Sequence, residues 1–181
     1  PLDLRSKFLW YHPHVAILTG IAWDHINVFP TFPEYVDTFR KFVDGIEENG
    51  TFIYYKHDTN LCEIASHARS DIKQLPYEAY QGNVDMKIFG KHNMENLQAA
   101  AFACQQIGVS LDDFYREIAT FTGASNRLEL IDEIGTNVAY KDFAHSPSKL
   151  RATVNAVRER YPKKQLVAAM ELHTFSSLMA D

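Results

Sequence analysis

The feature that most constrains this chain is a long helix, rich in small residues, predicted between residues 89 and 108. The helix is predicted by apolar residues that recur at spacings of three and four, namely Met94, Leu97, Ala101 and Cys104. Gly108 predicts its end. Residues 85–89 predict a short strand that leads directly into it. A strand followed at once by a helix favours an α/β fold.

The start of this helix is the first candidate binding site. Asn93 stands where a residue that caps a helix is expected, with Glu95 and Asn96 in the first turn. Free N–H groups at a helix start suit an anionic ligand, and the Asn96 amide carries donors and acceptors that could read the edge of a nucleobase. The spacing leaves open the alternative that Asn93 is only an ordinary cap.

Charge and cysteine content limit the class of ligand. The 181-residue chain has a formal net charge of −5 and no run of Lys and Arg, which argues against nucleic-acid or membrane partners. Cys62 and Cys104 lack the spacing of zinc ligands. No signal sequence is visible, and no apolar run reaches the roughly 18 residues of a membrane span. We therefore expect a cytoplasmic protein that acts on small molecules.

A second candidate site follows the first predicted strand. Residues 14–21 form a nearly continuous apolar run, which is typical of a buried parallel strand. Asp24 and His25 follow directly, and open α/β sheets bind ligands beyond the carboxyl ends of their strands. The pair could hold a metal ion or a proton. The alternative is that Asp24 only caps or orients the chain and that His25 has no role.

The rest of the chain predicts two domains. A small, polar, glycine-containing stretch at residues 122–126 marks the boundary, so residues 1–123 form one domain and residues 124–181 begin a second. The first domain has a predicted helix from Pro33, a strand at 51–56, a helix at 61–68, irregular edge strands within 71–84 and a helix from 110. The second has paired strands at 128–134 and 137–143, a helix from Pro147 and a buried strand at 165–170.

Three motifs stand in a distinctive order. They are Thr19-Gly20-Ile21-Ala22-Trp23-Asp24-His25, Gly90-Lys91-His92-Asn93-Met94-Glu95-Asn96 and Asp142-Phe143-Ala144-His145-Ser146-Pro147, with Arg127-Leu128-Glu129 between the last two. Together they resemble the Mur ligase family, the ATP-dependent amide ligases of peptidoglycan precursor synthesis. The resemblance covers nearly the whole chain. It implies the later part of a mainly parallel central ATP-binding sheet, followed by the start of a Rossmann-like C-terminal domain.

The resemblance also implies a role for each motif. His25 would bind magnesium. The residues that would contact ATP are His92, Asn93, Asn96, Arg127, Asp142 and His145. Among these, Asn96 would read the adenine and Arg127 would reach the phosphates. The reaction of the family needs such groups, because a substrate carboxylate attacks the γ-phosphate of ATP to give an acyl phosphate, which an amine then displaces.

Two departures from the family pattern leave the expected site incomplete. The Gly-Lys-Thr loop that grips phosphates in the family is absent, and so is the acidic magnesium ligand expected just before Pro1. We therefore expect a fragment of a longer ligase that depends on ATP and magnesium. The fragment alone should turn over no ATP, and no catalytic residue is assigned.

The expected substrates come from the same resemblance. Residues 5–8 and 171–174 look most like the members that join UDP-N-acetylmuramate to L-alanyl-γ-D-glutamyl-meso-diaminopimelate in peptidoglycan recycling. Glu171, His173 and Thr174 would face this amine. The alternative within the family is a ligase that adds L-alanine, and the alternative of another class is a nucleotide-binding module without catalysis. A metal hydrolase ranks lower, because the chain has no His-Glu-x-x-His run.

Overall fold

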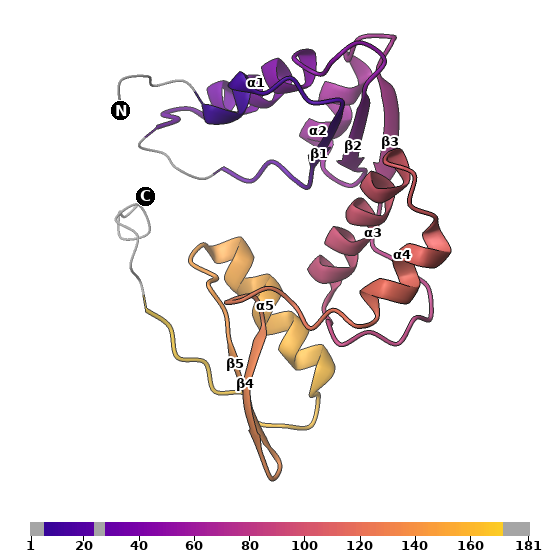
Figure 1. Cartoon of the computed structure of the whole chain (residues 1–181). Coiled ribbons are helices and arrows are strands. Elements are labelled where there is room, and N and C mark those ends of the chain that lie inside the picture. The colour runs from indigo at the N-terminus through magenta and orange to yellow at the C-terminus, as the bar shows by residue number, and fades with distance from the viewer. Residues whose placement is uncertain (1–5, 24–27, 172–181) are drawn as a thin grey trace. The chain divides into compact units, whose positions relative to one another are not determined.

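The computed structural model describes residues 6–23 and 28–171. The chain divides into two compact units (Figure 1). The sheet unit comprises residues 1–80 and 95–111, and the hairpin unit comprises residues 81–94 and 112–181. One helix, α3 (Lys91–Gln106), begins in the hairpin unit and continues into the sheet unit. The predicted division at residue 123 stays a prediction about the domains of the parent protein.

The sheet unit is built on three parallel strands. They are β1 (Val15–Leu18), β2 (Thr51–Tyr55) and β3 (Lys73–Tyr77), in the order β1-β2-β3. Their register aligns Ile17, Ile53 and Leu75 across the sheet. The other elements are the 3₁₀-helix η1 (Lys7–Trp10), α1 (Phe32–Asp44) and α2 (Thr59–Ser66). The predicted α/β class with a parallel sheet is confirmed.

Helices cover both faces of this sheet, because successive side chains of a strand point to opposite faces. Phe52 is fully buried in the core that α1 and α2 build with Val36, Val43, Leu61 and Ile64. Ile53 is buried on the other face in a cluster with Tyr77 and Ala99 of α3. Leu97 and Ala101 are buried as predicted, but the α3 residues packed in the sheet cluster are Ala99, Phe102 and Ala103.

Local signals account for α1. Thr31 and Glu34 form a capping box, in which the Thr31 side chain accepts from Glu34 N at 3.4 Å and Glu34 Oε2 accepts from Thr31 N at 3.2 Å. Pro33 lies in the first turn, where its missing N–H costs no hydrogen bond. The helix predicted from Pro33 is therefore confirmed.

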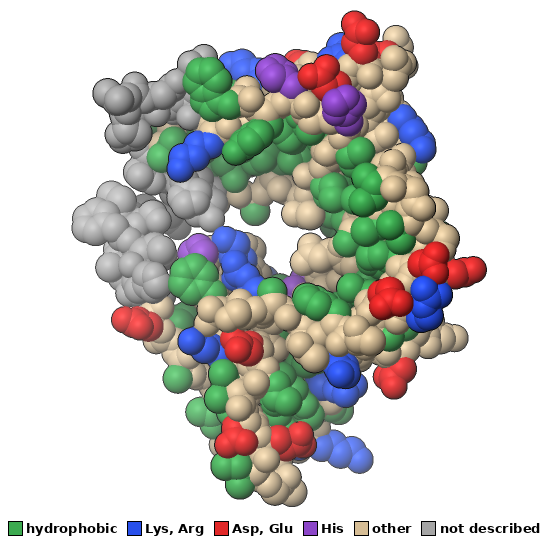
Figure 2. Space-filling view, in the orientation of Figure 1, with side chains coloured by type: hydrophobic (Ala, Val, Ile, Leu, Met, Phe, Trp, Pro, Cys, Tyr) green, Lys and Arg blue, Asp and Glu red, His purple; other side chains and the backbone are tan. Residues whose placement is uncertain are grey.

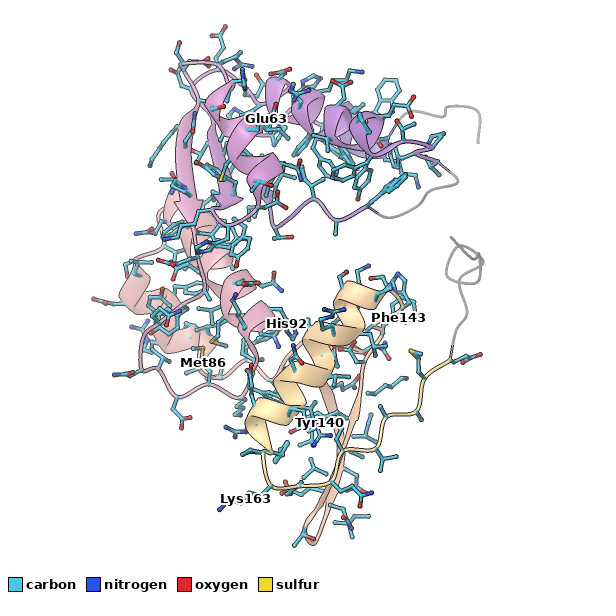
Figure 3. The ribbon with its side chains drawn as sticks, turned by 180° about the vertical axis from the view of Figure 1, so that it is seen from behind. Glu63, Met86, His92, Tyr140, Phe143 and Lys163 are labelled. Carbon is cyan, nitrogen blue, oxygen red and sulfur yellow. The ribbon has the colours of Figure 1, made fainter. Side chains whose placement is uncertain are left out.

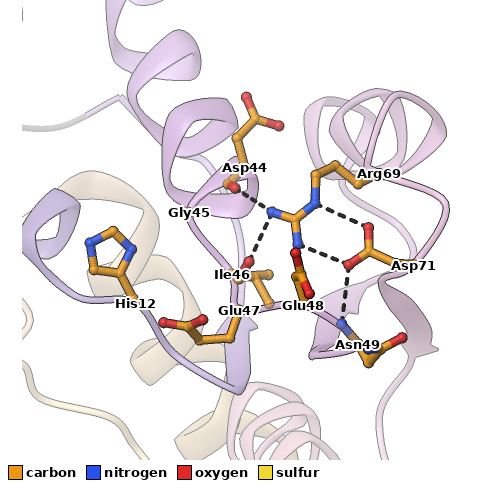
Figure 4. A pocket seen from close by; sticks show the side chains of 9 residues that line it. All are labelled: His12, Asp44, Gly45, Ile46, Glu47, Glu48, Asn49, Arg69 and Asp71. Atoms are coloured by element: carbon orange, nitrogen blue, oxygen red, sulfur yellow. Dashed lines mark hydrogen bonds and ion pairs between the residues drawn. The ribbon is translucent and has the colours of Figure 1, made fainter.

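Arg69 and Asp71, here called the arginine clamp, join chain segments at the amino-terminal edge of the sheet through hydrogen bonds (Figure 4). Arg69 Nη1 donates to the carbonyl oxygens of Asp44 at 2.6 Å and Ile46 at 2.9 Å, and Nε and Nη2 donate to the Asp71 carboxylate. Asp71 also accepts from the N–H of Asn49, which has φ 58°. These hydrogen bonds, that of Arg69 first, hold the Asp71 pKa well below its usual range. A cavity of about 610 Å³ adjoins the clamp.

The hairpin unit holds α4 (Leu111–Ile118), for all but its first residue, and an antiparallel pair with one helix against it. The pair is β4 (Glu129–Ile134) and β5 (Asn137–Lys141), with an irregularity between Leu130 and Asp132, and the helix is α5 (Pro147–Arg160). The Tyr140 and Tyr161 hydroxyls lie 2.7 Å apart, and burial raises the pKa of Tyr140. Hydrophobic side chains remain on the hairpin surface (Figure 2), where Ile134 is 70% exposed.

Two predicted strands are wrong. Residues 85–89 and 165–170 form no strand, although both are apolar enough for one. Apolar character does not make a strand without a neighbour for its N–H and C=O groups, and no described strand pairs with either segment. Val167 is 82% exposed, so the second segment is not buried either.

Candidate functional site

The start of α3 differs from the prediction. The helix begins at Lys91, so Asn93 lies within its first turn and the prediction that Asn93 is the cap is wrong. Asn93 instead donates from Nδ2 to the carbonyl oxygen of Phe89 at 2.8 Å. Gly90 has φ +90°, and its carbonyl oxygen accepts from Asn93 N at 3.0 Å and Met94 N at 3.2 Å. The turn is thus made by a glycine conformation that most residues avoid.

Within the hairpin unit, this turn packs against α5 and β5. A Cβ at Gly90 would lie 2.5 Å from Cβ of Ala156, so the approach of the turn to α5 requires glycine. The Phe89 ring lies 5.4 Å from the Tyr140 ring, and the Arg160 guanidinium lies 5.8 Å from the Phe89 ring centroid. Figure 3 labels His92 on α3, just after this turn, and Tyr140 on β5.

Asn96, the candidate adenine-reading residue, and His92 occupy neighbouring turns of α3. His92 and Asn96 are four residues apart and therefore lie on one side of the helix, with Asn96 exposed and His92 half-buried. Between them, Glu95 accepts a 2.7 Å hydrogen bond from the hydroxyl of Tyr55. Burial, with this bond as the second cause, raises the pKa of Tyr55 to about 12. The bond ties α3 to the carboxyl end of β2, the edge where such sheets bind ligands.

An aspartate fixes the chain after β1. Asp58 Oδ2 accepts from Ile21 N at 2.6 Å, while Oδ1 caps α2 by accepting from Asn60 N at 2.9 Å and Leu61 N at 3.0 Å. One half-buried carboxylate therefore joins the end of the first strand to the start of a helix. Ile21 precedes Asp24 by three residues.

The predicted magnesium ligand, His25, lies outside the described residues, as does Asp24. Within residues 6–23 and 28–171, no three His, Cys, Asp or Glu side chains gather in a way that could hold a metal ion. The described donor set therefore does not by itself form a magnesium site, and we derive no chemical step through the ion.

Arg127 and Asp142 come together in the hairpin unit, although 15 residues separate them in sequence. Asp142 Oδ2 accepts from the N–H of Leu128, the residue after Arg127, at 2.8 Å. The Arg127 guanidinium lies 5.7 Å from the Phe143 ring centroid, within the range of a cation–π contact. An exposed cation is thus held beside the segment that contains His145.

A hydrogen bond to the backbone shows which ring nitrogen of His145 carries the proton. Its Nδ1 lies 2.9 Å from the carbonyl oxygen of Phe143, which can only accept, so Nδ1 carries the proton. In the neutral ring Nε2 is then an acceptor, and it lies 3.5 Å from Lys149 Nζ. Next to this loop is a cavity of about 640 Å³, lined by apolar side chains together with Asp142, His145, Thr153 and Glu171.

The predicted amine-facing residues are described only in part. Glu171 is exposed and lines this cavity together with the half-buried Asp142 and His145. His173 and Thr174 lie outside the described residues. The predicted strand that would have carried Glu171 to a sheet edge does not form.

Sequence reasoning missed two supporting carboxylates: Asp58, and Glu95 as the partner of Tyr55. Asp58 had a detectable signal, because an aspartate directly before an apolar, helix-period segment is a preferred cap. The partner of Glu95 lies 40 residues away, and no local pattern announces it.

Comparison with known proteins shows which proteins the chain is similar to. Residues 3–77 match the family model of the Mur ligase middle domain. The UDP-N-acetylmuramate–L-alanine ligases of Lactiplantibacillus plantarum and Ligilactobacillus salivarius are 27% and 29% identical to the chain. Each alignment covers 98% of this chain and 45% of the relative, so the chain spans about half the length of these curated relatives. Residues 3–77 are thus similar to the Mur ligase middle domain, and the relatives that align with nearly the whole chain are Mur ligases.

Solved structures show the same fold at lower identity. A murein peptide ligase from Psychrobacter arcticus matches with a TM-score of 0.65 and 21% identity, covering 90% of this chain and 38% of that one. The UDP-N-acetylmuramate–alanine ligase of Thermotoga maritima matches with a TM-score of 0.65 and 18% identity, covering 90% and 42%. Separately, no helix in the described part of the chain is long and apolar enough to cross a membrane.

Proposed function

We propose that this chain is part of an ATP-dependent Mur ligase that forms an amide bond on UDP-N-acetylmuramate. One observation carries the proposal: a segment that matches the family's middle domain is followed by a hairpin unit in which Asp142 accepts a hydrogen bond from the backbone next to Arg127, while the Arg127 guanidinium and His145 both contact Phe143. Fold alone would not define a reaction, because the same fold serves many. The combination of domain and residues supports this one.

In the proposed site, ATP contacts the start of α3 and the loops of the hairpin unit. Asn96, with His92 and Asn93 beside it, reads the adenine. Arg127 faces the phosphates, and Asp142 and His145 complete the nucleotide site. We retain His25 as the proposed ligand of the magnesium ion that accompanies ATP, and residues 1–123 and 124–181 as parts of the central and C-terminal domains.

The chemistry proceeds in two steps. The lactyl carboxylate of UDP-N-acetylmuramate attacks the γ-phosphorus of ATP, so that a C–O–P bond forms and ADP leaves. The amine then attacks the acyl carbon, the C–O bond breaks, and phosphate departs with the former carboxylate oxygen. Negative charge collects on the phosphoryl oxygens in both steps, and a fixed guanidinium such as that of Arg127 offsets it. No protein base is assigned.

The proposed amine is the L-alanyl-γ-D-glutamyl-meso-diaminopimelate tripeptide, which makes the parent a murein peptide ligase. The support is the resemblance of residues 5–8 and 171–174 in sequence to that class of ligase. In the proposal, Glu171, His173 and Thr174 face the amine. L-Alanine is the second candidate, and the names of the curated relatives favour it. The two candidates share the sugar nucleotide and differ only in the amine.

Side-by-side kinetics with the two amines test the proposal. The full-length protein is supplied with ATP, magnesium, UDP-N-acetylmuramate and either tripeptide or L-alanine, and ADP and the ligated product are measured. A site built for several charged groups leaves them unpaired when alanine binds. We expect kcat/KM for the tripeptide to exceed that for alanine at least roughly a hundredfold, or about 2.7 kcal/mol at 1.36 kcal/mol per decade.

Other outcomes have distinct meanings. A preference for L-alanine would replace the first candidate amine by the second and leave the ligase reaction intact. ATP binding without product from either amine would contradict the ligase proposal and favour a nucleotide-binding module.

A further inference from the structure

The turn that carries Arg127 has an unusual backbone. The residues on either side of Arg127, Asn126 and Leu128, both have left-handed conformations, with φ of 56° and 46°. Asparagine tolerates this region, but a bulky residue such as leucine rarely enters it, so the conformation of Leu128 is strained. Leu128 is also buried, with 7% of its surface exposed. Strain of this kind persists only where the surroundings enforce it, and it is concentrated at functional sites.

Two carboxylates enforce it, one on each side of Arg127. Glu129 Oε2 accepts from the N–H of Asn126 at 2.7 Å and lies 3.3 Å from the Ser125 hydroxyl, which donates to it. Asp142 Oδ2 accepts from the N–H of Leu128 at 2.8 Å. Hydrogen bonds to an ionised carboxylate are roughly twice as strong as neutral ones. Each left-handed residue is therefore held by its own carboxylate.

Both carboxylates are themselves anchored. Glu129 is the first residue of β4, and its backbone lies opposite that of Lys141 in the antiparallel pair with β5. Asp142 Oδ1 accepts from Ala144 N at 2.7 Å and from Thr153 Oγ1 of α5 at 3.2 Å. The turn is thus bound to a strand and a helix, and such elements hold a functional side chain more precisely than a loop does.

We propose that Glu129 is a positioning residue for Arg127. It holds the Asn126–Leu128 turn so that the Arg127 guanidinium is presented beside Phe143, ready for an anionic phosphate. Asp142 supports the turn from the other side. The inference rests on the proposed function of Arg127 but concerns a different residue, whose carboxylate is engaged with the backbone and serves ATP only through Arg127.

A double-mutant cycle in the full-length enzyme tests the coupling. Glu129→Ala should lower kcat roughly tenfold, and Glu129→Gln, which keeps one acceptor oxygen, should restore most of the loss. In an Arg127→Ala background, Glu129→Ala should have no further effect, because residues that act through one another are not additive. Additive losses would overturn the inference. Glu133→Ala is the matched control, since Glu133 is an exposed glutamate on the same strand.

Limited trypsin digestion without nucleotide gives a readout that does not depend on activity. Cleavage after Arg127 should be several-fold faster in Glu129→Ala than in the wild type or Glu133→Ala, with cleavage after Arg158 of α5 as the internal reference. Equal rates after Arg127 would overturn the positioning role. If cleavage responds but Arg127→Ala keeps wild-type kcat, the positioning stands and the phosphate role of Arg127 fails. Glu129→Gln covers the case in which Glu129→Ala does not fold.

Discussion

Replacing Gly90 by alanine should destabilise the hairpin unit through two separable effects. The residue has φ +90°, and a side chain in a left-handed conformation costs roughly 1–2 kcal/mol. The new Cβ would also lie 2.5 Å from the Cβ of Ala156, and overpacking of this kind costs about 1–3 kcal/mol. We therefore expect a loss of about 2–5 kcal/mol, measured as the free energy of unfolding in urea.

Gly123→Ala is the matched control. Gly123 belongs to the same unit and has φ +102°, but an added Cβ would meet nothing nearer than 3.7 Å. This variant should show only the backbone strain. Ala156→Gly should recover part of the loss in the Gly90→Ala background, although glycine within a helix costs about 1 kcal/mol. Equal destabilisation by Gly90→Ala and Gly123→Ala, with no recovery by Ala156→Gly, would refute the packing of this turn against α5.

Three further predictions concern single side chains. In the full-length enzyme, Asn96→Ala should raise the KM for ATP roughly three- to tenfold with kcat little changed, because a contact with the base is equally strong in the ground and transition states. The control variant Gln105→Ala should leave the KM for ATP unchanged. An unchanged KM in Asn96→Ala as well would show that Asn96 does not contact ATP. Asp71→Asn should be less stable than the wild type near pH 7. Because the folded pKa of Asp71 lies below the ordinary 3.8, the ionised carboxylate stabilises the wild type above about pH 4, and this stabilisation is lost as the pH falls through the folded pKa. The difference in unfolding free energy between wild type and variant should therefore shrink when unfolding is measured in acid. Asp58→Ala should cost at least about 1 kcal/mol of unfolding free energy through the lost α2 cap alone, and a neutral result in a urea titration would contradict the role of that carboxylate.

Elements set by local patterns were predictable. The helix from Pro33, the strand at 51–56 and the hairpin around Gly135 follow from periodicity, caps and turn residues that are close in sequence. The strands predicted at 85–89 and 165–170 failed because a strand also needs a partner, and the apolar pattern alone does not reveal whether one is present.

Sequence motifs name candidate residues of the site, but they do not reveal the side chains that hold those residues in place. Arg127 and Asp142 were singled out by motif, and the structure brings them together through Leu128. The role of Glu129 could not be inferred, because it depends on the left-handed φ of Asn126, a property that no residue pattern specifies for a non-glycine residue. Asp71 escaped notice for a similar reason, since its partners come from two other segments of the chain.

The central claim is that the parent protein activates a carboxylate as an acyl phosphate, and an isotope experiment tests it most directly. UDP-N-acetylmuramate labelled with ¹⁸O in its lactyl carboxylate is incubated with the full-length protein, ATP, magnesium and the amine, and the released phosphate is analysed by mass spectrometry. Attack of the carboxylate on the γ-phosphorus transfers one carboxylate oxygen to phosphate, so the account predicts phosphate that carries one ¹⁸O per amide formed. Amide formation with unlabelled phosphate, or ATP hydrolysis that does not require UDP-N-acetylmuramate, would contradict it.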